Sequence, residues 1–186
     1  KGMNIQEYVP LAPRTTLGVG GSARFFIEAR SEKDIDEAIR FARGRGLPLF
    51  VLCEGSNVLV SDAGVEGVVL KIGIQDMSID DDGADILVSA GAGTRWDTVV
   101  DGVGKRGVFG VENLAGIPGS LGGAAVQNIG AYGAELSTVF EYADTAHRTT
   151  GERVRISRAD AAFAYRTSFF KKHPELLILR VALRLG

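Results

Sequence analysis

The residues from Gly116 to Gly133 (GIPGSLGGAAVQNIGAYG) have the composition of a ligand-binding loop. Six of these eighteen residues are glycine, and none is charged. Glycine lets the backbone adopt positive φ and lets a ligand approach without a Cβ in the way. Successive N–H groups in such a loop can converge on a phosphate, and Tyr132 could stack on a ring. A turn-rich connection between elements would also contain these residues, but the absence of charge favours a ligand cradle.

A second candidate loop, Glu54-Gly55-Ser56-Asn57, follows an apolar run that predicts a short buried strand. Gly55 allows a tight turn, while Ser56 and Asn57 offer a hydroxyl, an amide and backbone N–H groups to phosphate oxygens. Gly-Ser-Asn is also ordinary turn chemistry. Two neutral glycine-rich loops without a P-loop lysine suit a pyrophosphate held by backbone and hydroxyl donors. One loop from each of two small units would place the cofactor between them.

One further glycine pattern matches a dinucleotide-binding motif but lies in the wrong context. Residues 102–107 match G-x-G-x-x-G literally, but they end a predicted helix, whereas a dinucleotide fingerprint must follow a strand and open a helix. We therefore interpret the match as a helix stop. The sequence also has no G-x-x-x-x-G-K-[ST] motif, which excludes a P-loop nucleotidase.

Composition excludes several classes of function. The 186 residues carry a net charge of −2 with both signs mixed, unlike the clustered basic face of a nucleic-acid-binding protein. No apolar run approaches the roughly 20 residues of a membrane span, and no signal peptide is visible. The single Cys53 and the two histidines argue against a disulfide framework and a metal centre. We expect a cytoplasmic protein that contacts neither nucleic acid nor membrane.

The first unit is predicted to span residues 1–72. It begins with an irregular arm at 4–22, where prolines and glycines gather. Ser31 can cap a helix with Asp34 three residues on, and apolar residues recur on one helical face. That face consists of Ile35, Ala38, Ile39 and Ala42, and the expected strands of the unit are 23–29, 49–52, 58–60 and 64–72.

Residues 73–186 are predicted to form the second unit, which gives an α+β fold overall. An acidic hairpin turn, Asp80–Gly83, precedes its first strand. Thr94 and Asp97 can cap a helix that carries Trp96 on its apolar face. The expected strands of this unit are 86–90, 139–148, 152–157 and 176–183, with a helical turn starting at 157–160.

Four motifs in this order and spacing resemble the bacterial UDP-N-acetylenolpyruvoylglucosamine reductase (MurB) family. They are TTLGVGGSARFFIEA at 15–29, EGSN at 54–57, IPGSLGGAAVQNIGAYG at 117–133 and YRTSFFK at 165–171. The resemblance covers nearly the whole chain, and QNIGAYG resembles the type I branch. It implies noncovalent FAD in a two-part fold of the vanillyl-alcohol-oxidase type. It also implies that NADPH is the hydride donor and that UDP-N-acetylglucosamine enolpyruvate is reduced to UDP-N-acetylmuramate for peptidoglycan.

The resemblance also implies roles for individual residues. Arg166 matches the catalytic arginine, whose guanidinium can bind the substrate carboxylate bidentately and stabilise its growing charge. Tyr132, Tyr165 and Arg166 match substrate-binding positions. Outside this motif, Arg166 would be read as a surface arginine and Tyr165 as a core aromatic. The cofactor-binding positions are Gly55, Ser56, Asn57 and Val58 in the first loop, Ile117, Pro118, Gly119, Ser120, Gly122, Gly123, Asn128, Ile129 and Gly130 in the second, and Ile178 in the last strand.

One departure separates this sequence from the family pattern. Family enzymes continue into a third, substrate-binding domain with a proton-donating serine and a glutamate, neither of which has a counterpart up to Gly186. We expect a flavin-binding portion that is inactive alone and self-associates through apolar surface around Tyr132 and Arg166. The alternatives are another FAD oxidoreductase of the same fold, with Cys53 as a conceivable site of covalent flavin, and a noncatalytic flavin-binding module.

Overall fold

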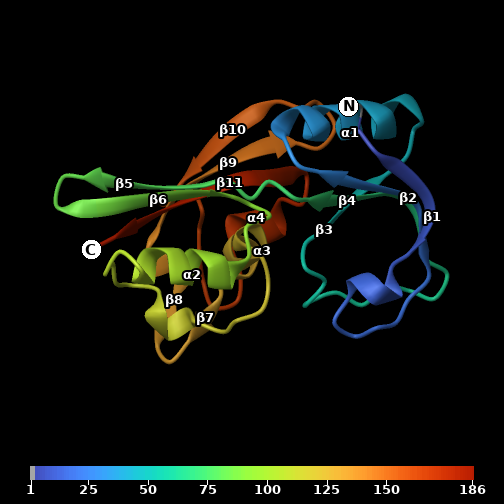
Figure 1. Ribbon diagram of the computed structural model, residues 1–186. Helices are drawn as coiled ribbons and strands as arrows, with labels where there is room; N and C mark the ends of the chain where they lie inside the picture. The colour runs from blue at the N-terminus through green and yellow to red at the C-terminus, as the bar shows by residue number, and fades with distance from the viewer. Residues whose placement is uncertain (1–2) are drawn as a thin grey trace.

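The computed structural model describes residues 3–186, so the first two residues of the expected unit 1–72 lie outside the described residues. Figure 1 shows two β-sheets side by side, with helices on their faces. The first sheet has the strand order β1-β2-β4-β3, in which β2, β4 and β3 are parallel and β1 is an antiparallel edge. Its strands are β1 (Ile5–Pro10), β2 (Ser22–Ala29), β3 (Leu49–Leu52) and β4 (Val65–Ile72).

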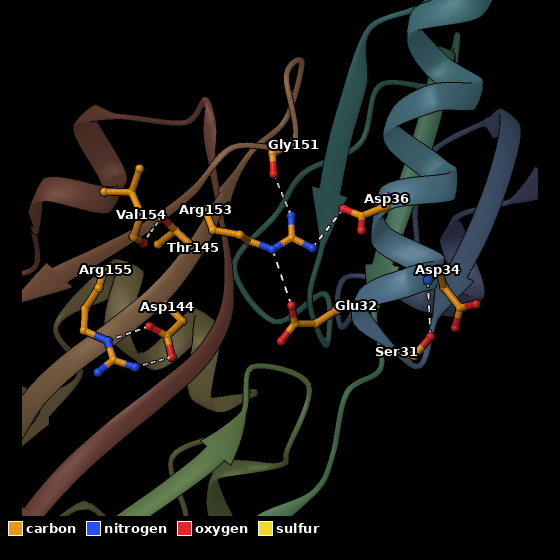
Figure 2. Close-up of polar contacts among 10 residues, drawn as sticks. All are labelled: Ser31, Glu32, Asp34, Asp36, Asp144, Thr145, Gly151, Arg153, Val154 and Arg155. Atoms are coloured by element: carbon orange, nitrogen blue, oxygen red, sulfur yellow. Dashed lines mark hydrogen bonds and ion pairs between the residues drawn. The ribbon is translucent and has the colours of Figure 1, made fainter.

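Helix α1 (Glu32–Gly44) connects β2 to β3 and packs on the first sheet. The predicted N-cap is confirmed, because Ser31 Oγ accepts a hydrogen bond of 3.2 Å from the backbone N–H of Asp34 (Figure 2). The predicted apolar face is buried as well. Local sequence therefore determines both the start of this helix and the face that it turns to the core.

The second sheet is antiparallel throughout, in the order β10-β9-β11-β6-β5. The helices α2, α3 and α4 lie together on one side of it (Figure 1). These elements are β5 (Met77–Asp82), β6 (Asp85–Gly91), α2 (Trp96–Gly104), α3 (Leu121–Gln127), β9 (Phe140–His147), β10 (Arg153–Ser157), α4 (Phe169–Lys172) and β11 (Leu176–Leu185). No helix within residues 3–186 is both long and apolar enough to cross a membrane.

One hydrophobic core joins the two sheets. Buried residues run without a break from Ile27 and Leu70 of the first sheet to Trp96, Leu121 and Leu179 of the second. A smaller cluster lies on the other face of the first sheet and includes Val9, Leu11, Phe26, Leu52 and Val69. Because the main core is shared, the sheets pack against each other and hold the loops between them in fixed positions.

The structure corrects two expectations about the first sheet. The arm at 4–22 is not irregular throughout, because Ile5–Pro10 form strand β1. Residues 58–60 do not form a strand: Leu59 is 77% exposed, and the segment runs beside the arm, where Ser61 O accepts a hydrogen bond from Gly21 N. β-Branched residues favour a strand only where a neighbouring strand supplies a ladder, and within residues 3–186 no strand pairs with this segment. The predicted strand 49–52 forms, but Phe50 and Val51 are partly exposed at the sheet edge.

Other corrections concern the second sheet and its helices. The acidic run Asp80–Asp82 belongs to strand β5, and the hairpin turn begins at Gly83. Thr94 does not cap α2; Arg95 is the N-cap residue and makes no side-chain cap bond. The helices α3 and α4 were not expected. The match at 102–107 is confirmed as a helix stop, since α2 ends at Gly104.

Candidate functional site

The first glycine loop follows β3 and is fixed by the N-terminal arm. Gly55 has φ of +71°, and its carbonyl accepts a hydrogen bond of 3.0 Å from Thr16 N. A Cβ on Gly55 would overlap the carbonyl oxygen of Arg14. Glycine is therefore required here both for the left-handed backbone and for the close approach of the arm. Within residues 3–186, the backbone N–H groups of Ser56 and Asn57 donate no hydrogen bond.

The second glycine stretch is a loop followed by the short helix α3. Ser120 caps α3 by accepting a hydrogen bond from Gly123 N at 3.4 Å. The N–H groups of Leu121 and Gly122 donate to the carbonyls of Thr94 and Ala92 at 2.8 and 2.9 Å. The amides of Leu121, Gly122 and Gly123 at the start of α3 are thus used inside the protein, whereas Gly119 N, immediately before the cap residue, donates no hydrogen bond within residues 3–186.

The structure brings the two loops together. A Cβ on Gly119, whose φ is +134°, would lie 3.7 Å from Ser56 Oγ. A Cβ on Gly123 would lie 3.7 Å from both Cβ and Sγ of Cys53. Side chains at Gly119 and Gly123 would therefore reach into the junction of the loops, and the glycines keep it open.

This junction fits a bound pyrophosphate. Within residues 3–186, the N–H groups of Ser56, Asn57 and Gly119 donate no hydrogen bond, and the sequence has no P-loop lysine motif. The hydroxyl of Thr94, buried beside the start of α3, has no hydrogen-bond partner among the described residues. Free backbone N–H groups of neighbouring glycine-rich loops are groups with which proteins can hold phosphate. A pocket of about 290 Å³ adjoins the first loop and is lined by Pro13, Arg14, Thr15, Thr16, Leu52, Cys53, Glu54 and Lys71.

Cys53 lies at the junction as an unreactive thiol. Burial raises its pKa above the usual value, partly offset by a hydrogen bond with the Ser120 side chain. The thiol therefore stays protonated at neutral pH, and a protonated thiol is a poor nucleophile. This environment is consistent with a noncovalent cofactor. Within residues 3–186, no three His, Cys, Asp or Glu side chains gather as metal ligands.

Two tight turns lie at the other end of α3, which has seven residues and is therefore about 10 Å long. The first is the tip of the hairpin formed by β7 (Gly130–Ala131) and β8 (Ala134–Glu135), where Tyr132 has φ of +51°. The second is 164–167, closed by two hydrogen bonds of 3.1 Å between Ala164 and Thr167, with Arg166 at φ of +55°. Non-glycine residues at positive φ carry strain, which persists where surrounding contacts enforce it.

Asn128 links the two turns. It ends α3 in the left-handed conformation and is 1% exposed. Its Nδ2 donates to Glu135 Oε2 at 2.9 Å and to Ala164 O at 3.1 Å, and its Oδ1 accepts from Ser137 N at 3.0 Å. The side-chain amide therefore has no free donor for a cofactor. Its hydrogen bonds instead hold the two turns in fixed positions relative to each other.

The predicted substrate residues lie on these turns. Tyr132 is 92% exposed and Tyr165 is 81% exposed. Arg166 crosses from one turn to the other and donates to Gly130 O at 3.0 Å. Within residues 3–186, neither Arg166 nor Lys171 has a carboxylate within ion-pair distance. Two uncompensated cations beside two exposed tyrosines can receive an anionic ligand with an unsaturated or aromatic part.

The remaining predicted cofactor residues divide into two groups. Val58, Ile117 and Pro118 lie on the exposed or half-exposed surface of the two loops. Ile129 and Ile178 are buried in the main core. Sequence reasoning missed the free hydroxyl of Thr94 and the contacts of Lys171. Lys171 is the last residue of the YRTSFFK motif, so the sequence motif could have identified it as a candidate site residue.

The comparisons with known proteins agree with this geometry. Residues 23–157 match the family model of the FAD binding domain. The chain is 45% identical over 185 residues to UDP-N-acetylenolpyruvoylglucosamine reductase of Pseudomonas aeruginosa, which covers 98% of this chain and 54% of that protein. It is 39% identical over 177 residues to the Streptomyces coelicolor protein of the same name, which covers 95% of this chain and 45% of that protein. The chain spans about half the length of these curated relatives.

Among solved structures, UDP-N-acetylenolpyruvylglucosamine reductase (MurB) from Thermus caldophilus is similar with a TM-score of 0.82 and 30% identity, covering 100% of this chain and 63% of that chain. A solvent-stable cholesterol oxidase has a TM-score of 0.73 at 18% identity, covering 100% of this chain and 38% of the oxidase chain. At that identity the oxidase shows the fold alone. The chain therefore has the α+β, FAD-binding fold of the vanillyl-alcohol-oxidase type.

Proposed function

The chain belongs to the FAD binding domain family, and from this premise we propose that it is the flavin-binding part of a UDP-N-acetylenolpyruvoylglucosamine reductase. The observation that carries the proposal is the pairing at the two ends of α3. Within the described residues 3–186, a junction with free backbone donors lies at one end, and a guanidinium without a carboxylate partner lies at the other. The similarity to named reductases from two bacterial genera supports the same reading.

FAD would be held noncovalently between the two loops. The N–H groups of Ser56, Asn57 and Gly119 and the hydroxyl of Ser56 would hold its pyrophosphate. When bound, FAD accepts hydride from NADPH and passes it to an enolpyruvyl group. The loops belong to different sheets, so we propose 1–72 and 73–186 as the two flavin-binding units. The buried Ile129 and Ile178 would support the cradle from beneath.

Arg166 would act on the carboxylate of the enolpyruvyl ether. Hydride addition at the far carbon of the double bond increases negative charge toward this carboxylate. A guanidinium already held in place can bind both carboxylate oxygens and stabilise that charge as it develops. Tyr132 and Tyr165 would border the bound UDP-sugar with their exposed rings. A proton would then be added at the carbon next to the carboxylate, in the resembled family by a serine of the third domain, and the product would be UDP-N-acetylmuramate, a precursor of peptidoglycan.

Two further proposals concern the chain in its setting. A bacterial, cytoplasmic location follows from the proposed reaction, whose nucleotide-sugar substrate and NADPH are cytoplasmic metabolites. The exposed rings of Tyr132 and Tyr165 form an apolar surface that would promote self-association in the absence of another covering domain. Sedimentation of the 186-residue chain at high concentration tests this second proposal, and a clean monomer would contradict it.

The functional proposal is tested in two steps. First, the chain is titrated with FAD, and quenching of flavin fluorescence should saturate at one FAD per chain; release of the flavin on denaturation would establish noncovalent binding. Second, NADPH oxidation is measured with UDP-N-acetylglucosamine enolpyruvate, for the chain and for the chain joined to the C-terminal half of the Pseudomonas aeruginosa relative. Substrate-dependent oxidation by the joined protein alone is the expected result. FAD binding without activity in either form would favour a noncatalytic flavin module instead.

A further inference from the structure

Lys171 makes contacts that the proposed reaction has not yet used. Its Nζ donates to the carbonyl oxygen of Arg166 at 3.1 Å and to Gln127 Oε1 at 3.2 Å. Gln127 is the last residue of α3, and Lys171 lies on α4. The ammonium group therefore ties the backbone of Arg166 to the end of α3.

Arg166 needs a contact that holds its backbone, because its positive φ is an unfavourable conformation for a residue with a side chain. It occupies the left-handed region in a two-residue turn, where a glycine would normally be found. Its side chain is attached at Gly130 O, and its own carbonyl is attached at Lys171 Nζ. These hydrogen bonds fix Arg166 at both ends. Without the second bond, the turn can relax toward conformations with negative φ, and the guanidinium then loses its direction.

We infer that Lys171 is the positioning residue of Arg166: it holds the arginine backbone in the left-handed turn so that the guanidinium points toward the substrate carboxylate. The inference rests on the proposed function for the identity of that ligand, but not for the geometry itself. The Lys171 ammonium group also adds a second positive charge near the position of an anionic substrate. A hydrogen bond from a charged donor is stronger than a neutral one, which suits a group that must oppose backbone strain.

The helix that carries Lys171 does not depend on this ammonium group. Ser168 is the N-cap of α4, and its hydroxyl donates to Val126 O at 2.8 Å. Phe170 is 3% exposed and packs into the main core. Truncation of the Lys171 side chain should therefore leave α4 in place. The neighbouring Lys172 provides a matched control, because its side chain is exposed, carries the same charge and makes no hydrogen bond or ion pair within residues 3–186.

The first test observes Arg166 directly and requires neither substrate nor turnover. The Nε–Hε signal of Arg166 in a ¹⁵N NMR spectrum of the 186-residue chain is identified by its loss in Arg166→Lys. In Lys171→Met, we expect this signal to move to the position of a free arginine and to exchange faster with water. In Lys171→Arg it should stay close to the wild-type position, and in Lys172→Met it should not move. An unchanged Arg166 signal in Lys171→Met would overturn the inference even if the chain proves to be the proposed reductase part.

The second test separates positioning from folding in the form of the protein that turns over substrate. Lys171→Met should lower kcat for the enolpyruvyl substrate about tenfold or more, while NADPH still reduces the bound flavin at the wild-type rate. Lys171→Arg should recover most of this loss, and Lys172→Met should match wild type in kcat and in melting temperature. An equal loss in Lys171→Met and Lys172→Met would reject a positioning role. If no form of the protein turns over the substrate, the proposed function fails, and the NMR result still decides the role of Lys171.

Discussion

The two ends of α3 use opposite strategies. At its N-terminal end, the loops 53–58 and 116–120 leave backbone donors free and keep side chains out of their junction. At its C-terminal end, Asn128, Arg166 and Lys171 make hydrogen bonds that connect the hairpin tip and the turn 164–167 to each other and to α3. The first end is suited to hold a cofactor by its backbone. The second is suited to keep one side chain in a strained position. Substitutions should therefore act differently at the two ends.

The largest effect is expected for Gly55→Ala. Its Cβ would overlap Arg14 O at a positive φ, so the arm or the loop must move. We expect the free energy of unfolding to fall by about 4 kcal/mol and FAD binding to be lost. Gly83→Ala is the matched control, because Gly83 has the same φ of +71° but open space around it; the conformational cost alone is about 1 kcal/mol. Urea denaturation measures both, and equal losses would show that the close contact is unimportant.

Asn128 tests the other end of α3. Asn128→Ala removes three hydrogen bonds and places alanine at positive φ. We expect a loss of about 3 kcal/mol in the free energy of unfolding. Asn128→Gly relieves the backbone strain and should lose about 1 kcal/mol less than the alanine variant. If both variants unfold within about 0.5 kcal/mol of wild type, Asn128 does not hold the turns together.

Gly119→Ala is expected to change FAD affinity more than stability. The added methyl group would enter the space between the loops, 3.7 Å from Ser56 Oγ, at a φ that disfavours alanine. We expect FAD affinity to fall about tenfold, which corresponds to roughly 1.4 kcal/mol. Fluorescence titration measures the affinity. Wild-type affinity in Gly119→Ala would show that the cofactor does not approach this backbone closely.

The smallest effects are expected away from both ends, at two arginines of strand β10. Arg153 connects the second sheet to α1 through ion pairs with Asp36 at 2.8 Å and Glu32 at 3.4 Å, whereas Arg155 pairs with Asp144 of the neighbouring strand (Figure 2). All these side chains are substantially exposed, so each pair is worth about 1 kcal/mol or less. Arg153→Ala should lower the free energy of unfolding by about 1 kcal/mol and Arg155→Ala by about 0.5 kcal/mol. Both should bind FAD normally, and weaker FAD binding in Arg153→Ala would mean that the contact with α1 also sets the spacing of the loops.

Local patterns determined much of this fold. The cap at Ser31, the apolar face of α1 and the strands with a regular apolar core face depend on neighbours within a few residues, so the sequence predicts them. The two glycine loops were recognised for the same reason, because glycine and small polar residues limit what a loop can do. The prediction of a strand at 58–60 was wrong because strand formation needs a partner that the local sequence does not supply.

Only the tertiary structure decided which groups are free. By sequence, Gly119, Gly122 and Gly123 are equally good candidates to offer a backbone N–H to a ligand. In the structure, the N–H groups of Gly122 and Gly123 already donate hydrogen bonds within the protein. Asn128 matches a cofactor position by its motif, but its polar atoms all face other residues. These outcomes depend on contacts between segments far apart in the chain, which no local pattern contains.

The sequence by itself therefore determined the kind of cofactor and the residue types of the two glycine loops proposed to hold it. The tertiary structure decided that backbone donors stay free at one end of α3 and that polar groups bond to one another at its other end. It also added Lys171 to the residues that position Arg166. The physical reason is that residue type limits what a group can bond, whereas long-range packing decides which of those bonds the protein already makes for itself.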